Sequence, residues 1–178
     1  MLPKTERGGF SLLEVVIAMS VFVIGSGAIL STLIVGTSLR ESTRETAMAV
    51  EAAQSAVERM GGADFSELFA SFNSNPLDDP GAAGTAQGSS FAVPGLDAQE
   101  GDVDGLPGEI FFPGDGTILR EDWNDQPLGM PRDLNGDGVI DALDHSLDYS
   151  NLAVRVRIVW WGSSGDREIT IFTTFADI

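Results

Sequence analysis

Residues 10–39 read FSLLEVVIAMSVFVIGSGAILSTLIVGTSL, and this stretch decides the fold. Glu14 is its only charged residue, and the 25 residues from Val15 to Leu39 carry no charge. At about 1.5 Å per residue, a helix of that length crosses a hydrocarbon core of about 30 Å. Lys4 and Arg7 precede the run, so the positive-inside tendency predicts a cytoplasmic N-terminus and an exported remainder.

Two other kinds of N-terminal segment share some of these features. A cleavable secretory signal peptide also has a basic start and an apolar run, but its run is shorter and it has no acid near its start. An unprocessed anchor with a single span is the second alternative. The position of Glu14 therefore calls for a more specific interpretation.

Residues 7–14, Arg-Gly-Gly-Phe-Ser-Leu-Leu-Glu, resemble the processing motif of prepilins, the precursors of type IV pilin-like proteins. In that family a membrane-embedded prepilin peptidase cuts between a Gly and a following Phe or Met, and then methylates the new α-amino group. The resemblance implies cleavage between Gly9 and Phe10, after a leader of nine residues. Glu14 then becomes the fifth mature residue, where the family places its acidic residue.

The resemblance also implies that Glu14 acts in assembly. An ionised side chain at the bilayer centre costs up to about 2.5–3.5 kcal/mol on insertion scales, so such residues are usually partnered. In the family the partner is the N-terminal ammonium of a neighbouring subunit, which here would be on Phe10. Ser11-x-x-Glu14 also fits a capping box, and an acid suits the positive end of the helix dipole. The two roles are compatible.

Helical periodicity continues beyond the apolar run and predicts one helix from about residue 11 to 60, with Gly61-Gly62 as its stop. Apolar residues recur at three- and four-residue spacing at Ala47, Val50, Ala53, Val57 and Met60. The predicted polar face carries Arg40, Glu41, Arg44, Glu45, Glu51, Glu58 and Arg59. We expect a cleaved leader over 1–9, a transmembrane and assembly half of the helix over 10–39, its exposed half over 40–62, and a globular β-rich domain over 63–178.

Alternating apolar residues near the C-terminus predict a β-hairpin that covers the exposed half of the helix. Its first strand has Val154, Val156, Ile158 and Trp160 on one face, and its second has Ile169, Ile171 and Phe175. Residues 162–166 form the predicted turn, 89–93 and 109–112 are short predicted strands, and 73–88 are a predicted loop. The fold class is therefore predicted to be α+β and pilin-like, with a long N-terminal helix packed on a small antiparallel sheet.

The hairpin sequence over 154–175 also resembles the C-terminal end of PilV-like minor pilins and small pseudopilins. Within it, Trp160 and Trp161 fit either a sugar-binding platform or, as is commoner, the core or interface of a sheet.

Residues 133–144, DLNGDGVIDALD, have the spacing of a calcium-binding loop. Calcium needs six to eight oxygen ligands around a sharply curved chain, and a Gly at the sixth position, here Gly138, permits the turn. The stretch resembles EF-hand and dockerin loops, but Asp144 replaces the longer Glu at the twelfth position and no second copy is present. An acidic surface turn is the alternative. The predicted ligands are Asp133, Asn135, Asp137, the Val139 carbonyl, Asp141 and Asp144.

Composition excludes several classes of function. The net charge of −17, with ten Lys and Arg residues, argues against a nucleic-acid partner. The absence of Cys excludes a disulfide framework and thiolate chemistry, and a single His excludes a multi-His metal site. Many carboxylates are present, but nothing in the sequence pairs them as in a glycosidase, so no enzyme is predicted.

The sequence therefore predicts a structural subunit of a type IV pilus or a type II secretion pseudopilus. Its expected partners are prepilin peptidase, other pilin or pseudopilin subunits and inner-membrane lipid. Its expected location is the cytoplasmic membrane, with the C-terminal domain in the periplasm or outside the cell. The alternative is a membrane-anchored calcium- or carbohydrate-binding module that uses the same export route.

Overall fold

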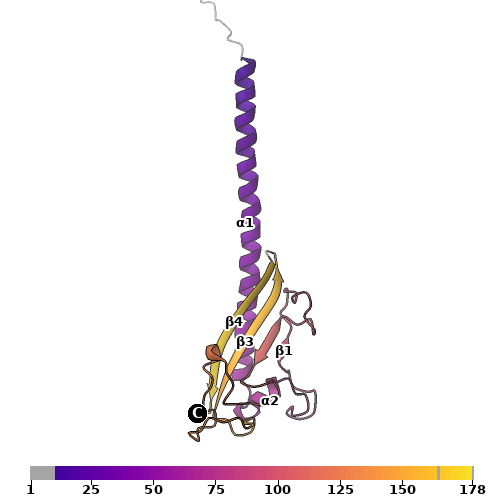
Figure 1. Ribbon diagram of the computed structural model, residues 1–178. Coiled ribbons are helices and arrows are strands. Elements are labelled where there is room, and N and C mark those ends of the chain that lie inside the picture. Colours follow the sequence, from indigo (N-terminus) through magenta and orange to yellow (C-terminus); the bar gives the residue numbers. More distant parts are fainter. Residues whose placement is uncertain (1–10, 164, 178) are drawn as a thin grey trace, which may run out of the picture. The chain divides into compact units, whose positions relative to one another are not determined.

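The computed structural model describes residues 11–163 and 165–177, and the elements follow the α+β order expected from the sequence (Figure 1). The chain divides into two compact units, residues 1–41 and 42–178. Helix α1 (Leu12–Gly61) contributes residues to both. The predicted long N-terminal helix and small C-terminal antiparallel sheet are confirmed.

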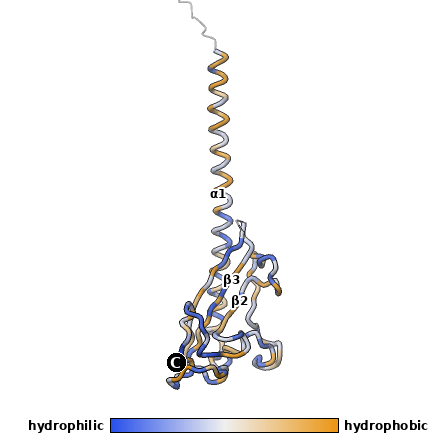
Figure 2. The backbone as a smooth tube through the Cα atoms, viewed as in Figure 1, coloured by the Kyte–Doolittle hydropathy of each residue, from blue (hydrophilic) through white to orange (hydrophobic). Residues whose placement is uncertain are grey.

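In the first unit, α1 is apolar and its side chains are almost all exposed; Figure 2 shows hydrophobic residues along this part of the helix. By length and composition, α1 is the one helix among the described residues that is apolar enough to cross a membrane. Its hydroxyls bond within the helix: Ser20 donates to the Val16 carbonyl at 2.8 Å and Thr32 to the Ala28 carbonyl at 2.9 Å. Polar groups satisfied in this way are compatible with an apolar environment.

In the second unit, α1 buries a stripe of small residues and one methionine, at Ala49, Ala53, Ala56 and Met60. The predicted face was wrong at Ala47, which is exposed. Six residues turn a helix by about 600°, so Ala47 lies about 120° around the axis from Ala53. The helix ends as predicted at Gly61, and the N–H of Gly62 donates to the Glu58 carbonyl at 3.0 Å.

A four-stranded antiparallel sheet in consecutive order supplies the rest of the core. Its strands are β1 (Ser90–Phe91), β2 (Gly108–Phe111), β3 (Asn151–Gly162) and β4 (Gly165–Ala176). Val156 pairs with Ile110 on one side and Ile171 on the other, and the antiparallel pairing of β3 with β4 confirms the predicted hairpin. The alternating residues Val154, Val156, Ile158 and Trp160 are all buried.

The two tryptophans at the end of β3 face opposite sides of the sheet. Trp160 is 2% exposed and belongs to the core, whereas Trp161 is 58% exposed. Because successive side chains in a strand point to opposite faces, the two rings do not form a common platform.

Three short helices contribute residues to the core or pack against it, and the sequence did not predict them. They are the 3₁₀ helix η1 (Phe65–Glu67), α2 (Leu68–Phe72) and the 3₁₀ helix η2 (Gln126–Leu128). Phe69 of α2 meets Phe112 edge-on, with ring centroids 5.1 Å apart. The segments between β2 and β3 have no other helix or strand, and they carry the candidate site.

Candidate functional site

The predicted processing residues Gly9 and Phe10 lie outside the described residues, and Glu14 lies in the first turn of α1. The Glu14 side chain is exposed, with the exposed side chains of Leu12 and Leu13 before it. The N–H of Val15 donates to the Ser11 carbonyl at 3.2 Å, which closes the first turn. Glu14 is thus the single charge on an otherwise apolar helical surface between residues 11 and 39.

The predicted calcium loop curves around the carboxylate of Asp133. Its Oδ1 accepts the N–H of Gly136 at 2.6 Å, and its Oδ2 accepts the N–H of Gly138 at 2.8 Å. Both glycines have positive φ, +83° and +87°, which L side chains rarely adopt. The sharp turn expected at Gly138 is therefore present.

The other predicted oxygen ligands mostly bond to nearby backbone. Asn135 Oδ1 accepts the Asp137 N–H at 3.0 Å, and Asp137 Oδ1 accepts the Val139 N–H at 2.7 Å. Asp144 Oδ1 accepts the N–H groups of Leu119 and Ser146, at 3.2 and 3.0 Å, both outside this turn. Such Asx-type bonds shape a loop by themselves, so the geometry alone does not require an ion.

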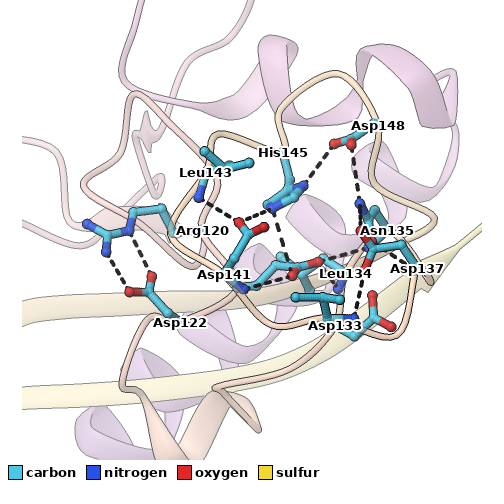
Figure 3. Close-up of polar contacts among 12 residues, drawn as sticks. Arg120, Asp122, Asp133, Leu134, Asn135, Asp137, Asp141, Leu143, His145 and Asp148 are labelled. Atoms are coloured by element: carbon cyan, nitrogen blue, oxygen red, sulfur yellow. Dashed lines mark hydrogen bonds and ion pairs between the residues drawn. The ribbon is translucent and has the colours of Figure 1, made fainter.

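Asp141 instead comes together with two residues that the sequence analysis did not select (Figure 3). One ligand atom from each of Glu121, Asp141 and His145 lies within 4.8 Å of the others, and the group could hold a metal ion. His145 Nε2 is 3.1 Å from Asp141 Oδ1 and 3.8 Å from Glu121 Oε2. Among the described residues, this is the one group of three or more His, Cys, Asp or Glu side chains close enough to do so.

Burial distinguishes this cluster from the exposed carboxylates elsewhere on the chain. Glu121 is 0% exposed and His145 is 4% exposed, whereas Asp141 is half-buried. Glu121 Oε1 accepts the N–H groups of Leu134 and Asn135 at 2.6 and 3.1 Å. One buried carboxylate therefore joins the segment after β2 to the start of the predicted calcium loop.

The imidazole of His145 is held from both sides. Nδ1 lies 3.1 Å from Asp148 Oδ1 while Nε2 faces Asp141 and Glu121. Burial opposes the charged form most strongly, but the hydrogen bonds to Asp141 and Asp148 and the charge of Glu121 together raise the pKa of His145. The Leu143 N–H and then His145 lower the pKa of Asp141.

Sequence reasoning missed Glu121 and His145 for different reasons. Glu121 lies outside the loop motif, and nothing in its neighbourhood indicates that its side chain is buried. His145 follows the motif directly, but a lone His was considered only as part of a multi-His site. The spacing of four residues between Asp141 and His145 is the signal that could have identified His145 as a candidate metal ligand.

Comparison with known proteins supports the N-terminal interpretation. Residues 5–30 match the family described as the prokaryotic N-terminal methylation motif. The match covers the N-terminal segment alone, and the long apolar helix and small antiparallel sheet form an α+β, pilin-like layout. The matched segment contains Gly9, Phe10 and Glu14. No curated protein and no solved structure is significantly similar to the chain.

Proposed function

We propose that the chain is a structural subunit, a minor pilin or pseudopilin, of a type IV pilus or a type II secretion pseudopilus. The N-terminal methylation motif over residues 5–30 carries this proposal, because it overlaps the start of an apolar helix long enough to cross a membrane. In this role the chain catalyses nothing. It is a substrate of prepilin peptidase, which cuts between Gly9 and Phe10 and methylates Phe10.

Glu14 is the residue on which assembly depends in this proposal. Its carboxylate lies on an apolar helical surface, where an unpaired charge is unfavourable in lipid or against another helix. Cleavage creates an ammonium group on Phe10, and the ammonium of a neighbouring subunit would neutralise Glu14. Pairing the two charges fixes the axial register of adjacent subunits, while Leu12, Leu13 and the apolar residues that follow pack between helices.

The same features support a location in the cytoplasmic membrane. Lys4 and Arg7 precede the apolar run, so the N-terminus would remain in the cytoplasm. The sheet-containing unit, with most of the 27 acidic residues, would then face the periplasm or the exterior. Incorporation into a filament would move this unit outward without changing its fold.

Mass spectrometry of the chain purified from host membranes tests the processing step. The expected mature terminus is an N-methylated Phe10; retention of Met1, or cleavage before any other residue, would contradict the proposal.

Assembly is tested separately by cross-linking and co-purification of the chain with its fellow subunits. Glu14→Gln keeps the shape of the side chain and removes its charge, so the recovery of cross-linked subunits should fall strongly. Glu41→Gln, on an exposed site further along the same helix, is the matched control and should leave recovery unchanged. Equal recovery from both variants would exclude the register role of Glu14.

We also propose that residues 133–144 bind calcium in a structural role. The spacing of the oxygen side chains and the curved chain around Asp133, with its positive-φ glycines, support the proposal. Asp144 is shorter than the usual Glu, so we expect an affinity of about 0.1–1 mM, as in extracellular modules. Bound calcium would offset repulsion among the carboxylates of the loop.

Thermal unfolding of the full chain in detergent micelles tests the calcium proposal. Millimolar calcium should raise the unfolding midpoint, and the double substitution Asp133→Ala with Asp137→Ala should abolish that increase. Asp166→Ala, at the exposed tip of the hairpin, is the control and should preserve it. The absence of any response of the wild-type chain to calcium would refute the proposal.

A further inference from the structure

We propose that Glu121, Asp141 and His145 form a second cation site beside the calcium loop, with Asp141 as its ligand rather than as a calcium ligand, and that this site selects a borderline divalent ion such as zinc over calcium. The inference does not depend on the role of the N-terminal helix. It rests on the donor atoms, their separations, their burial and the way in which the imidazole is oriented.

The separations suit a small ion. Ligands at about 2.0–2.1 Å from a tetrahedral zinc ion lie about 3.3 Å from one another. His145 Nε2 is 3.1 Å from Asp141 Oδ1 and 3.8 Å from Glu121 Oε2. All three ligand atoms lie within 4.8 Å of one another, so side-chain adjustments of about an ångström would bring them to zinc-binding distances.

Glu121 presents a buried oxygen with an incomplete set of partners. Its Oε1 accepts two N–H groups, but among the described residues its Oε2 has only the Asp141 N–H at 3.4 Å and His145 Nε2 at 3.8 Å. In the described part of the chain, no arginine forms an ion pair with it. Its one ion-pair partner among the described residues is the imidazole of His145, which carries a positive charge only when it is protonated. An ion between Oε2 and Nε2 would supply that charge.

The orientation of His145 matches that of a metal ligand. Metal-binding histidines usually donate the other ring N–H to a carboxylate or carbonyl, which fixes the tautomer. Asp148 Oδ1 lies 3.1 Å from Nδ1 and can accept that proton, which leaves Nε2, on the side of Asp141 and Glu121, to bind an ion. Figure 3 shows His145 between Asp148 and Asp141. Asp148 is therefore a positioning residue rather than a ligand.

The donor set decides between ions. Calcium takes six to eight oxygen ligands in proteins, whereas an imidazole nitrogen with two carboxylates suits zinc and related ions. Two of the three ligands are buried, which leaves little room for the waters that calcium would need. Asp141 is half-buried, so solvent reaches the cluster from its side and a water molecule can complete the zinc coordination.

The test uses the full chain in detergent micelles, without added histidines, titrated with zinc, cobalt and calcium. Zinc should bind with one-to-one stoichiometry, and cobalt should give the visible absorption of a low-symmetry site, which zinc then removes. His145→Gln and Glu121→Gln should each weaken zinc binding at least tenfold. Asp148→Asn should weaken it by a smaller factor than either ligand variant does, at the lower end of the roughly 10–100-fold range of groups that orient a ligand.

Two control variants make the result specific. Asp122→Asn removes a neighbouring carboxylate that pairs with Arg120 at 2.6 Å, and it should leave zinc binding unchanged. Asp137→Asn alters the calcium loop and removes none of the three proposed zinc ligands, so it should weaken calcium binding and preserve zinc binding. Circular dichroism verifies that each variant is folded, and cobalt absorption reports the site independently of stability.

Several outcomes would overturn the proposal. Wild-type zinc affinity in a folded His145→Gln variant would mean that zinc binds adventitiously elsewhere. Equal occupancy of the cluster by calcium, lost in His145→Gln, would refute the selectivity. The absence of any zinc or cobalt binding would show that the cluster is a buried charge network only, while leaving the pilin and calcium-loop proposals intact.

Discussion

Glu45 Oε1 accepts the backbone N–H of Ser163 at 3.0 Å, which ties the middle of helix α1 to the tip of the β3–β4 hairpin. The other carboxylate oxygen accepts the indole N–H of the buried Trp160 at 3.4 Å. Arg167, at the start of β4, also reaches the helix and donates to the Ser42 carbonyl at 3.5 Å. The hairpin tip is therefore held to α1 by polar contacts, beyond the apolar core formed by Ala49 and Ala53.

Replacing Glu45 by alanine should detach the hairpin tip from the helix. A hydrogen bond to a charged group contributes about 1.5–3 kcal/mol, and the partly exposed geometry here places the expected loss near 1–2 kcal/mol. Glu51→Ala, on the exposed face of the same helix, should change stability by less than about 0.5 kcal/mol. Thermal unfolding followed by tryptophan fluorescence measures both, and equal midpoints for the two variants would contradict the assignment.

The single tyrosine links the short helices to the segment before β3. The Tyr149 hydroxyl donates to the Phe65 carbonyl at 2.6 Å and accepts the Phe69 N–H at 3.2 Å. Tyr149→Phe keeps the ring and removes both bonds, so a buried N–H loses its partner and the expected loss is about 1–3 kcal/mol. Amide hydrogen exchange of Phe69 should accelerate more than that of the β3 amides. Unchanged exchange at Phe69 would show that the hydroxyl does not hold α2.

Long regular elements could be predicted because their signals are local. The uncharged run and Gly61-Gly62 defined both ends of α1, and strict alternation over Val154–Trp160 defined β3. The buried helical face was placed partly wrong, at Ala47, because alanines occur all around this part of the helix. Only the packed sheet distinguishes the alanines that are buried from those that are exposed.

The short elements and the cluster could not be predicted for a different reason. Helix α2 has five residues, too few for a periodic signal, and it is stabilised by contacts such as Phe69 with Phe112. Glu121 and Asp141 are 20 residues apart, and the segment between them contains only one 3₁₀ turn. Their proximity therefore depends on the path of a segment that has little regular secondary structure. The loop motif indicated Asp141, but its partners follow from tertiary structure alone.

Glu109 and Glu168 provide a test of pH dependence on the sheet, since both contact Arg157. Burial raises the pKa of Glu109, and the negative charges of Asp102 and Asp104 act in the same direction. The positive charge of Arg157 opposes them without reversing the shift. The hydrogen bond from Arg157 lowers the pKa of Glu168. The folded state therefore binds a proton more readily than the unfolded chain at Glu109, and less readily at Glu168.

The two glutamine variants should accordingly change stability in opposite directions. At pH 7, Glu109→Gln should raise the unfolding midpoint, because the ionised Glu109 is unfavourable in the folded state; this gain should shrink as the pH falls through the raised pKa. Glu168→Gln should lower the midpoint at pH 7, and its loss should diminish as the pH falls through the depressed pKa. Unfolding midpoints between pH 7 and 4 measure both trends, and shifts of the same sign would contradict the assignment.

Gly114 lies at the start of the segment that leads from β2 to Glu121, with φ at +146°, and a Cβ atom there would collide with the Ile118 carbonyl oxygen. The N–H of Arg120 donates to the Pro113 carbonyl at 2.8 Å and closes this loop. The shape of the loop therefore determines the backbone position of Glu121. Gly114→Ala adds a steric clash to backbone strain of about 1–3 kcal/mol. Gly101→Ala, at φ +94° with open space around it, carries the strain alone. In thermal unfolding, we expect the Gly114 variant to lose clearly more stability than the Gly101 variant. The Gly114 variant should also weaken zinc binding, whereas the Gly101 variant should keep wild-type zinc affinity. Equal losses of stability would show that the loop adjusts without displacing Ile118.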